Sequence, residues 1–229
     1  MLNPIRKRIW LVAALCLAPM AALAQSASPA PQARFVVVLD AAHGGGDPGG
    51  KLASGKLEKD VVLAFSVRLR SLLAARGIPV VTTRESDAAP TADERAQAAN
   101  RSQAGACLIL HTTESGTGIH FYVSSLSPNQ PGHFVAWKTA QAAYVQRSLA
   151  LAGRLNSSLH QAGFTVQMGR TSLPGLDSMT CPAVAVELAP DRDASRAIKA
   201  EPDSSDYQTR AANALAAALL AWRAEVRQP

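Results

Sequence analysis

Two kinds of apolar pattern alternate along the chain from about residue 34 onward. Short apolar runs rich in β-branched residues predict strands buried on both faces, and longer segments with apolar residues three or four positions apart predict helices packed on a core. The predicted strands span 35–39, 78–83, 106–110, 118–124, 164–169 and 183–188. The predicted helices span 58–76, 91–103, 136–162 (one helix or two joined ones) and 206–226.

This alternation predicts an α/β fold: a single domain over residues 34–229, with a mostly parallel twisted sheet flanked by helices on both faces. Thr91 and Glu94 have the spacing of a capping box at a helix start, and Gly77 is suited to end the preceding helix. Residues 125–133 contain two prolines and a glycine and predict a loop. In sheets of this kind, ligands bind at the carboxyl ends of the strands.

The beginning of the chain has the three parts of an export signal: a basic start, an apolar run over 9–17 and the small residues of Ala22-Leu23-Ala24. We predict a cleavable signal peptide over 1–24, followed by a flexible linker rich in Ala, Ser and Pro over 25–33. The apolar run is short for a membrane span and Pro19 follows it closely, so we expect no retained span. A retained anchor is the alternative.

Charge and cysteines add little to this picture. The 229-residue chain has 23 basic and 17 acidic residues. Loss of the three basic residues at 6–8 with the signal leaves 20 basic residues and a net charge of +3, which is too small to indicate a nucleic-acid partner. Cys107 and Cys181 lie outside the predicted signal. They could form a disulfide after export or remain two small buried apolar residues, and both alternatives stay open.

Three of the predicted buried strands lead to residues that can bind a metal or move a proton. The first strand runs into His43, the third ends at His111 and the last carries Glu187. If these strands are parallel, the three side chains meet at one edge of the sheet. Taken singly, a histidine at a strand end is often only a hydrogen-bonded side chain, and Glu187 could pair with an arginine or a lysine.

Glu58 joins this group through helical spacing. It shares one helix face with Val62, Phe65 and Leu69, so a carboxylate heads a stripe that faces the core. Burying an unpaired carboxylate costs on the order of several kcal/mol. The helix N-terminus would offset about 0.3–1 kcal/mol of this cost, and a partner of the helix dipole is the plainer interpretation of Glu58. A bound cation would satisfy the carboxylate better.

Two histidines and one glutamate form a known catalytic zinc set that leaves a fourth position for water. We therefore predict Zn²⁺ bound by His43, Glu58 and His111. Zinc makes its bound water more acidic, and a second carboxylate is then needed to move the water's proton to the leaving group. Glu187 is the predicted catalytic residue.

Three other histidines and one glycine-rich loop compete with this interpretation. His120 lies in a strand that could reach the same edge, so it is a reserve ligand, whereas His133 and His160 are expected to have surface or packing roles. Residues 45–52 are close in pattern to a phosphate-binding loop. Leu52 stands where such a loop needs a hydroxyl residue, which argues against phosphate binding.

Six segments, in a fixed order, carry a family resemblance. They are Asp40-Ala-Ala-His43-Gly-Gly-Gly-Asp47-Pro48-Gly49-Gly50, Glu58-Lys59-Asp60, Val80-Val-Thr-Thr-Arg84, Arg95-Ala-Gln-Ala-Ala-Asn100, Leu108-Ile-Leu-His111 and Pro182-Ala-Val-Ala-Val-Glu187. Together they resemble the motifs of the zinc-dependent N-acetylmuramoyl-L-alanine amidases of type 3, over residues 34–225.

The resemblance implies zinc as cofactor and peptidoglycan as substrate. The reaction implied is hydrolysis of the amide between N-acetylmuramic acid and the L-alanine of the stem peptide, in cell-wall turnover or cell separation. His43, Glu58 and His111 are the implied ligands, Glu187 is the implied catalytic carboxylate, and the implied location is the periplasm. A protein activator is left open.

The chain departs from the family pattern close to both histidines. Ala41 and Ala42 replace a Pro-Gly pair, and Thr112 and Thr113 replace an Ala-Asn pair. One alternative is therefore a zinc-binding, wall-associated regulatory protein with the same fold and little activity. Another is a zinc hydrolase that cuts a different bond, such as a peptidase.

Overall fold

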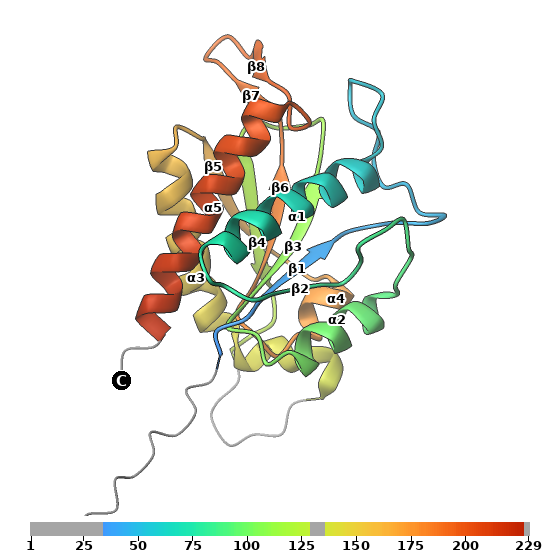
Figure 1. The fold of residues 1–229 in the computed structure, drawn as a ribbon, viewed down its shortest axis with the longest axis vertical. Helices are drawn as coiled ribbons and strands as arrows, with labels where there is room; N and C mark the ends of the chain where they lie inside the picture. Colours follow the sequence, from blue (N-terminus) through green and yellow to red (C-terminus); the bar gives the residue numbers. More distant parts are fainter. Residues whose placement is uncertain (1–33, 129–135, 227–229) are drawn as a thin grey trace, which may run out of the picture. The chain divides into compact units, whose positions relative to one another are not determined.

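The short apolar runs form one six-stranded sheet in the computed structural model, which describes residues 34–128 and 136–226 (Figure 1). The strands are β1 Val37–Ala41, β2 Val80–Thr82, β3 Ala106–Thr112, β4 Ile119–Ser124, β5 Val166–Thr171 and β6 Ala183–Leu188. Their order across the sheet is β2-β1-β3-β6-β4-β5. The central strands β1, β3 and β6 are almost entirely buried, as continuous apolar runs predict.

Strand direction decides which side chains meet at the carboxyl edge. Strands β2, β1, β3 and β6 are mutually parallel, which confirms the mostly parallel sheet and makes the three strands that lead to the predicted site run in the same direction. Strand β4 is antiparallel to β6, and β5 is parallel to β4. The first residues of β4 therefore lie at the edge where β6 ends.

Helices cover both faces of the sheet, as predicted (Figure 1). The larger core lies under α1 Glu58–Ala75, α3 Val145–Gln161 and α5 Ser205–Val226. The smaller core lies under α2 Ala92–Arg101 and the one-turn helix α4 Pro174–Asp177, beside the 3₁₀ helix η1 Trp137–Ala143. The predicted segment 136–162 is thus two helices, and the Thr91–Glu94 capping box is present at the start of α2.

Three short elements had no sequence signal strong enough to predict them: α4, and the strands β7 Asp191–Arg192 and β8 Ile198–Ala200, which pair with each other. Each has at most four residues, too few to show a period. The predicted signal peptide over 1–24, the linker over 25–33 and His133 lie outside the described residues. Within the described part of the chain, no helix is long and apolar enough to cross a membrane.

Cys107 and Cys181 form a disulfide, which decides between the two alternatives left by the sequence. Cys107 belongs to β3, and Cys181 lies just before β6, the neighbouring parallel strand. Their Cα atoms are 6.3 Å apart and both side chains are buried. The bridge therefore joins the amino-terminal ends of the two strands that carry His111 and Glu187.

Candidate metal centre

His43, Glu58 and His111 converge at the carboxyl edge of the sheet. His43 lies in the loop after β1, Glu58 is the first residue of α1, and His111 is near the end of β3. Their ligand atoms all lie within 4.8 Å of one another. Glu58 Oε1 is 3.2 Å from His43 Nε2 and 2.9 Å from His111 Nδ1. Among the described residues, these three form the group that could hold a metal ion.

The Glu58 carboxylate is buried and held by backbone groups. Its side chain is 8% exposed, Oε1 accepts a hydrogen bond from Thr112 N–H at 3.2 Å, and Oε2 accepts one from Gly50 N–H at 2.8 Å. Burial acts to raise the pKa of Glu58, but the hydrogen bonds from His111 and Gly50 outweigh it, so the net shift of the pKa is downward. Glu58 is therefore held as a carboxylate, the form that binds a metal.

Asp47 orients the His43 ring. Its Oδ2 is 2.8 Å from His43 Nδ1, which leaves Nε2 turned toward Glu58. Asp47 Oδ1 also accepts a hydrogen bond from Gly49 N–H at 3.0 Å, and the hydrogen bonds from His43 and Gly49 lower the pKa of Asp47. A carboxylate on the far nitrogen is how proteins commonly fix the tautomer of a metal-binding histidine.

Two buried arginines hold the loop that carries His43. Arg84 donates to the carbonyls of Ala41 and Ala42 at 2.8 and 2.9 Å. Arg95 donates to the carbonyls of Ala41 and His43 at 2.7 and 2.6 Å, and it also bonds the buried carboxylate at the end of β1. His43 has a left-handed backbone, with φ of 60°. Because the arginines bond backbone carbonyls, this support of the loop does not depend on the side chains of Ala41 and Ala42.

The donor set fits zinc. Two imidazole nitrogens and one carboxylate oxygen face one another, and this His₂Glu combination is one that zinc hydrolases use while keeping a position open. The carboxylate is ionised, His43 is held in one tautomer, and the side chains of His43 and His111 are 22% and 29% exposed, so the group is open to solvent on one side.

Glu187 lies beside this group without belonging to it. In the sheet register it pairs with His111, so both side chains leave the same face of neighbouring strands that are about 4.8 Å apart. Its Oε2 is 2.8 Å from His120 Nδ1. Glu187 therefore pairs with a histidine, not with the arginine or lysine that the sequence left open.

His120, the reserve ligand suggested by the sequence, is not one of the grouped residues, and its Nδ1 is bonded to Glu187. It does reach the predicted edge, because β4 is antiparallel to β6 and His120 stands opposite Glu187. His160 is exposed on α3, as expected for a surface residue.

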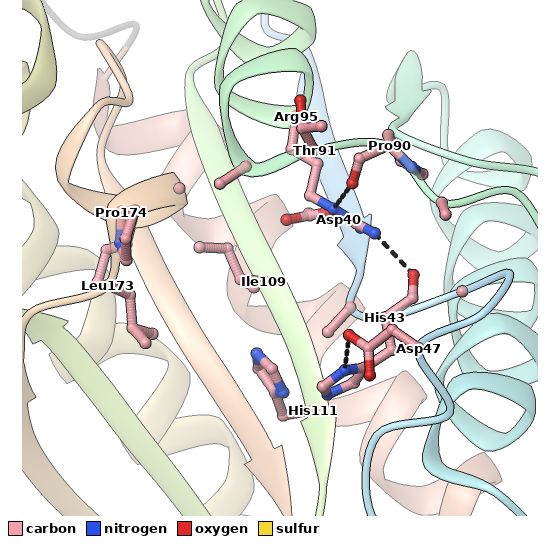
Figure 2. Close-up of a pocket in the computed structure, with 16 residues that line it drawn as sticks. Asp40, His43, Asp47, Pro90, Thr91, Arg95, Ile109, His111, Leu173 and Pro174 are labelled. Atoms are coloured by element: carbon pink, nitrogen blue, oxygen red, sulfur yellow. Dashed lines mark hydrogen bonds and ion pairs between the residues drawn. The ribbon is translucent and has the colours of Figure 1, made fainter.

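A cleft of about 410 Å³ opens from the two imidazoles (Figure 2). Figure 2 shows Ile109 of β3 on its floor, Leu173 and Pro174 on one wall, and Pro90 and Thr91 on the other. A second cavity of about 190 Å³ shares His111 and Leu173 with it and also borders Glu187 and Tyr122. The second cavity therefore borders both His111 of the candidate metal group and Glu187.

Sequence reasoning assigned no role to Asp47, Arg84 or Arg95, although all three lie in the matched motifs. A weak signal for Arg95 exists, since it shares a helix face with the buried alanines Ala96 and Ala99. The carbonyl partners of the arginines depend on how loops fold together, which no spacing in the chain reveals.

The chain is similar to known amidases in sequence and in fold. The family model described as N-acetylmuramoyl-L-alanine amidase (Amidase_3) matches residues 37–221. N-acetylmuramoyl-L-alanine amidase AmiA of Escherichia coli K12 is 38% identical over 76 residues, which are 33% of this chain and 26% of the relative. The chain spans less than two thirds of the length of the curated relatives that it matches, from 18% to 58%.

Two solved structures share the fold at low sequence identity. The apo form of the amidase Ami1 from Mycobacterium abscessus has a TM-score of 0.67 at 21% identity, covering 82% of this chain and 98% of the other. The CwlD amidase from Clostridioides difficile, solved in complex with the GerS lipoprotein, has a TM-score of 0.63 at 18% identity, covering 84% of this chain and 100% of the other. These likenesses support the architecture, a single α/β domain.

Proposed function

Because the chain belongs to the N-acetylmuramoyl-L-alanine amidase family, we propose that it is a zinc-dependent hydrolase of peptidoglycan. The bond cut is the amide between N-acetylmuramic acid and the L-alanine of the stem peptide. The observation that carries the proposal is the convergence of His43, Glu58 and His111 within 4.8 Å, with Glu187 in register beside His111.

Each residue has a distinct task in this proposal. His43 Nε2, Glu58 Oε1 and His111 Nδ1 are the ligand atoms. When bound, zinc would polarise the scissile carbonyl and make a water molecule more acidic. Glu187 takes the proton of the attacking water and delivers it to the nitrogen of the leaving L-alanine, a task that contributes roughly 10²- to 10⁴-fold to the rate. The apolar cleft beside the imidazoles takes the substrate and excludes water.

The test combines metal analysis with product analysis of the purified chain. We expect about one zinc per chain, and we expect digested peptidoglycan to release intact stem peptides with a free L-alanine amino terminus. Glu187→Gln should lose roughly 10²- to 10⁴-fold in rate and keep its zinc. His111→Ala should lose both the activity and the bound zinc. His160→Gln, on an exposed helix face, should keep both.

Other outcomes would point elsewhere. Bound zinc without any product, with and without added cell-envelope extract, would favour the regulatory protein of the same fold. Cleavage inside the stem peptide would favour a peptidase. Since the CwlD structure contains a lipoprotein, we include a protein activator in the proposal, and the extract arm of the assay tests for one.

Location is the remaining part of the proposal. The basic and apolar beginning of the sequence supports export to the periplasm and cleavage after Ala24. Fractionation of cells that express the tagged full chain, followed by amino-terminal sequencing, tests this directly. A mature protein that begins at Gln25 is expected, and retention of residues 1–24 in a membrane fraction would contradict it.

A further inference from the structure

We propose that His120 is a positioning residue for the reaction: it donates a hydrogen bond from Nδ1 to Glu187 Oε2 and thereby fixes the orientation of the catalytic carboxylate. This inference rests on the proposed function for its catalytic meaning. The pairing on which it depends is a property of the folded protein and can be measured without any substrate.

Both nitrogens of the His120 ring have partners. Nδ1 is 2.8 Å from Glu187 Oε2, and Nε2 is 3.2 Å from the carbonyl oxygen of Thr117. The side chain is 10% exposed. A Cβ added at Gly116 would lie 2.5 Å from the His120 ring, so the loop between β3 and β4 closes directly over it. The ring is therefore held by two bonds and by steric contact.

The chemistry of these partners determines where the protons are. A carbonyl oxygen can only accept, so Nε2 must carry a hydrogen. An ionised Glu187 can also only accept, so Nδ1 must carry one too, and the ring is then an imidazolium paired with a carboxylate. In agreement, the hydrogen bond to Glu187 raises the pKa of His120, outweighing the opposing effect of burial.

In this arrangement the two carboxylate oxygens of Glu187 have different roles. Oε2 is occupied by His120, which leaves Oε1 as the oxygen that takes the water's proton and passes it on. A carboxylate side chain without such a partner would rotate freely about its last bonds, and imprecise orientation of a catalytic group lowers the rate. Other titratable groups on the surrounding elements are Tyr122 on β4, His111 on β3 and Arg192 of β7, whose Nε donates to the carbonyl of Gly116.

The test compares two substitutions with a matched control. His120→Ala removes the donor, and His120→Asn keeps an N–H close to the position of Nδ1. We expect His120→Ala to lower kcat about 10- to 100-fold with little change in KM, and His120→Asn to recover most of that loss. Zinc content should stay at the wild-type level in both. His160→Ala, on an exposed face of α3, should have wild-type kcat.

A second measurement does not depend on activity. In an NMR titration of the histidine ring protons, the pKa of His120 should lie above the ordinary histidine value of about 6.5. In Glu187→Gln it should move downward, because the carboxylate that raises it has gone. The same titration point in both proteins would overturn the proposal, since it would mean that the pair does not form.

The kinetic measurements on the His120 variants also test the proposal. Wild-type kcat in His120→Ala would overturn the proposal. Loss of zinc in that variant would show a ligand in place of a positioning residue. Equal loss of kcat in both variants, matched by equal falls in melting temperature, would show a packing role. If the wild-type chain has no amidase activity, the proposed function fails, and the NMR titration still decides whether His120 and Glu187 are coupled.

Discussion

Removing the disulfide should destabilise the fold strongly and leave the candidate site nearly unchanged. The bridge closes a segment of 74 residues between Cys107 and Cys181. In the chain-entropy model, a closed loop of this length restricts the unfolded chain enough to stabilise the native state by about 4 kcal/mol. That value is a large part of the roughly 5–15 kcal/mol by which a typical domain is stable.

The site should be spared because of where the bridge lies. Cys107 and His111 are both in β3, four positions apart, which corresponds to about 13 Å along the strand. The register of β3 with β6 is also maintained by backbone hydrogen bonds along the whole strand pair, from Cys107–Ala183 to Thr112–Leu188. Zinc affinity and kcat at 25 °C should therefore stay within about twofold of the wild-type values under conditions that keep the chain folded.

The assay is urea unfolding of the oxidised protein and of the same protein kept reduced with dithiothreitol. With an m-value of about 2 kcal/mol/M, the expected loss lowers the midpoint by about 2 M urea. A Cys107→Ala/Cys181→Ala double variant controls for effects of the reductant, since dithiothreitol should not move its midpoint. Reduction breaks the cross-link but leaves the cysteine side chains in place. It therefore measures the effect of the cross-link on stability without the cavity that alanine substitution would create.

Three results would refute this reasoning. The first is an equal midpoint for the oxidised and reduced proteins. The second is two free thiols in protein recovered from an oxidising compartment. The third is loss of zinc on reduction while the chain remains folded, which would mean that the bridge, and not the strand register, holds the site-bearing strands together.

Further predictions concern the candidate site. Asp47→Ala should weaken zinc binding about 10- to 100-fold in chelator competition, because the His43 ring loses the carboxylate that orients it. An unchanged zinc affinity would argue against this orienting role of Asp47. Gly49→Ala should abolish zinc binding and cost roughly 1–2 kcal/mol, since its φ is +65° and the new Cβ would lie 2.6 and 2.7 Å from two ligand side chains. Gly46→Ala, whose new Cβ would have no atom within 4 Å, should change neither zinc binding nor stability. His120 has a raised pKa, so its charge pair stabilises fully below about pH 6.5 and less as pH rises through the folded-state pKa. Wild type and His120→Asn should thus differ more in urea midpoint at pH 6 than at pH 9.

The central half of the sheet could be predicted from the sequence because burial on both faces leaves a clear pattern. Continuous apolar runs identified β1, β3 and β6, and the rule that ligands gather at carboxyl ends placed His43, His111 and Glu187 together. Glu58 was found by a different route, its place at the head of an apolar helix stripe. Local patterns were sufficient for the burial of these elements, and the parallel direction that the sequence argument assumed for β1, β3 and β6 is present in the structure.

The supporting contacts could not be predicted in this way. Arg84 and Arg95 bond the carbonyls of Ala41, Ala42 and His43, which are 42 to 54 positions away in the chain, so these partners are set only by the folded loops. The Cys107–Cys181 pairing likewise required the knowledge that β3 and β6 are neighbours in the sheet. Such contacts are set by strand order, and several strand orders are compatible with the same alternation of strands and helices.

His120 shows most clearly how one topological choice changes a residue's chemistry. In a parallel β4, the second residue of the strand would lie at the amino edge of the sheet, far from Glu187. Antiparallel pairing with β6 brings it opposite Glu187, and a shift of one residue would turn its ring to the other face. Strand β6 also separates β4 from β3, which places His120 about two strand spacings, roughly 10 Å, from the strand of His111. Both ring nitrogens of His120 have partners outside the metal group: Nδ1 is 2.8 Å from Glu187 Oε2 and Nε2 is 3.2 Å from the Thr117 carbonyl oxygen. The strand order and the antiparallel direction of β4 thus make His120 the neighbour of Glu187, the carboxylate that we propose moves the proton, and His120 is not among the grouped metal ligands.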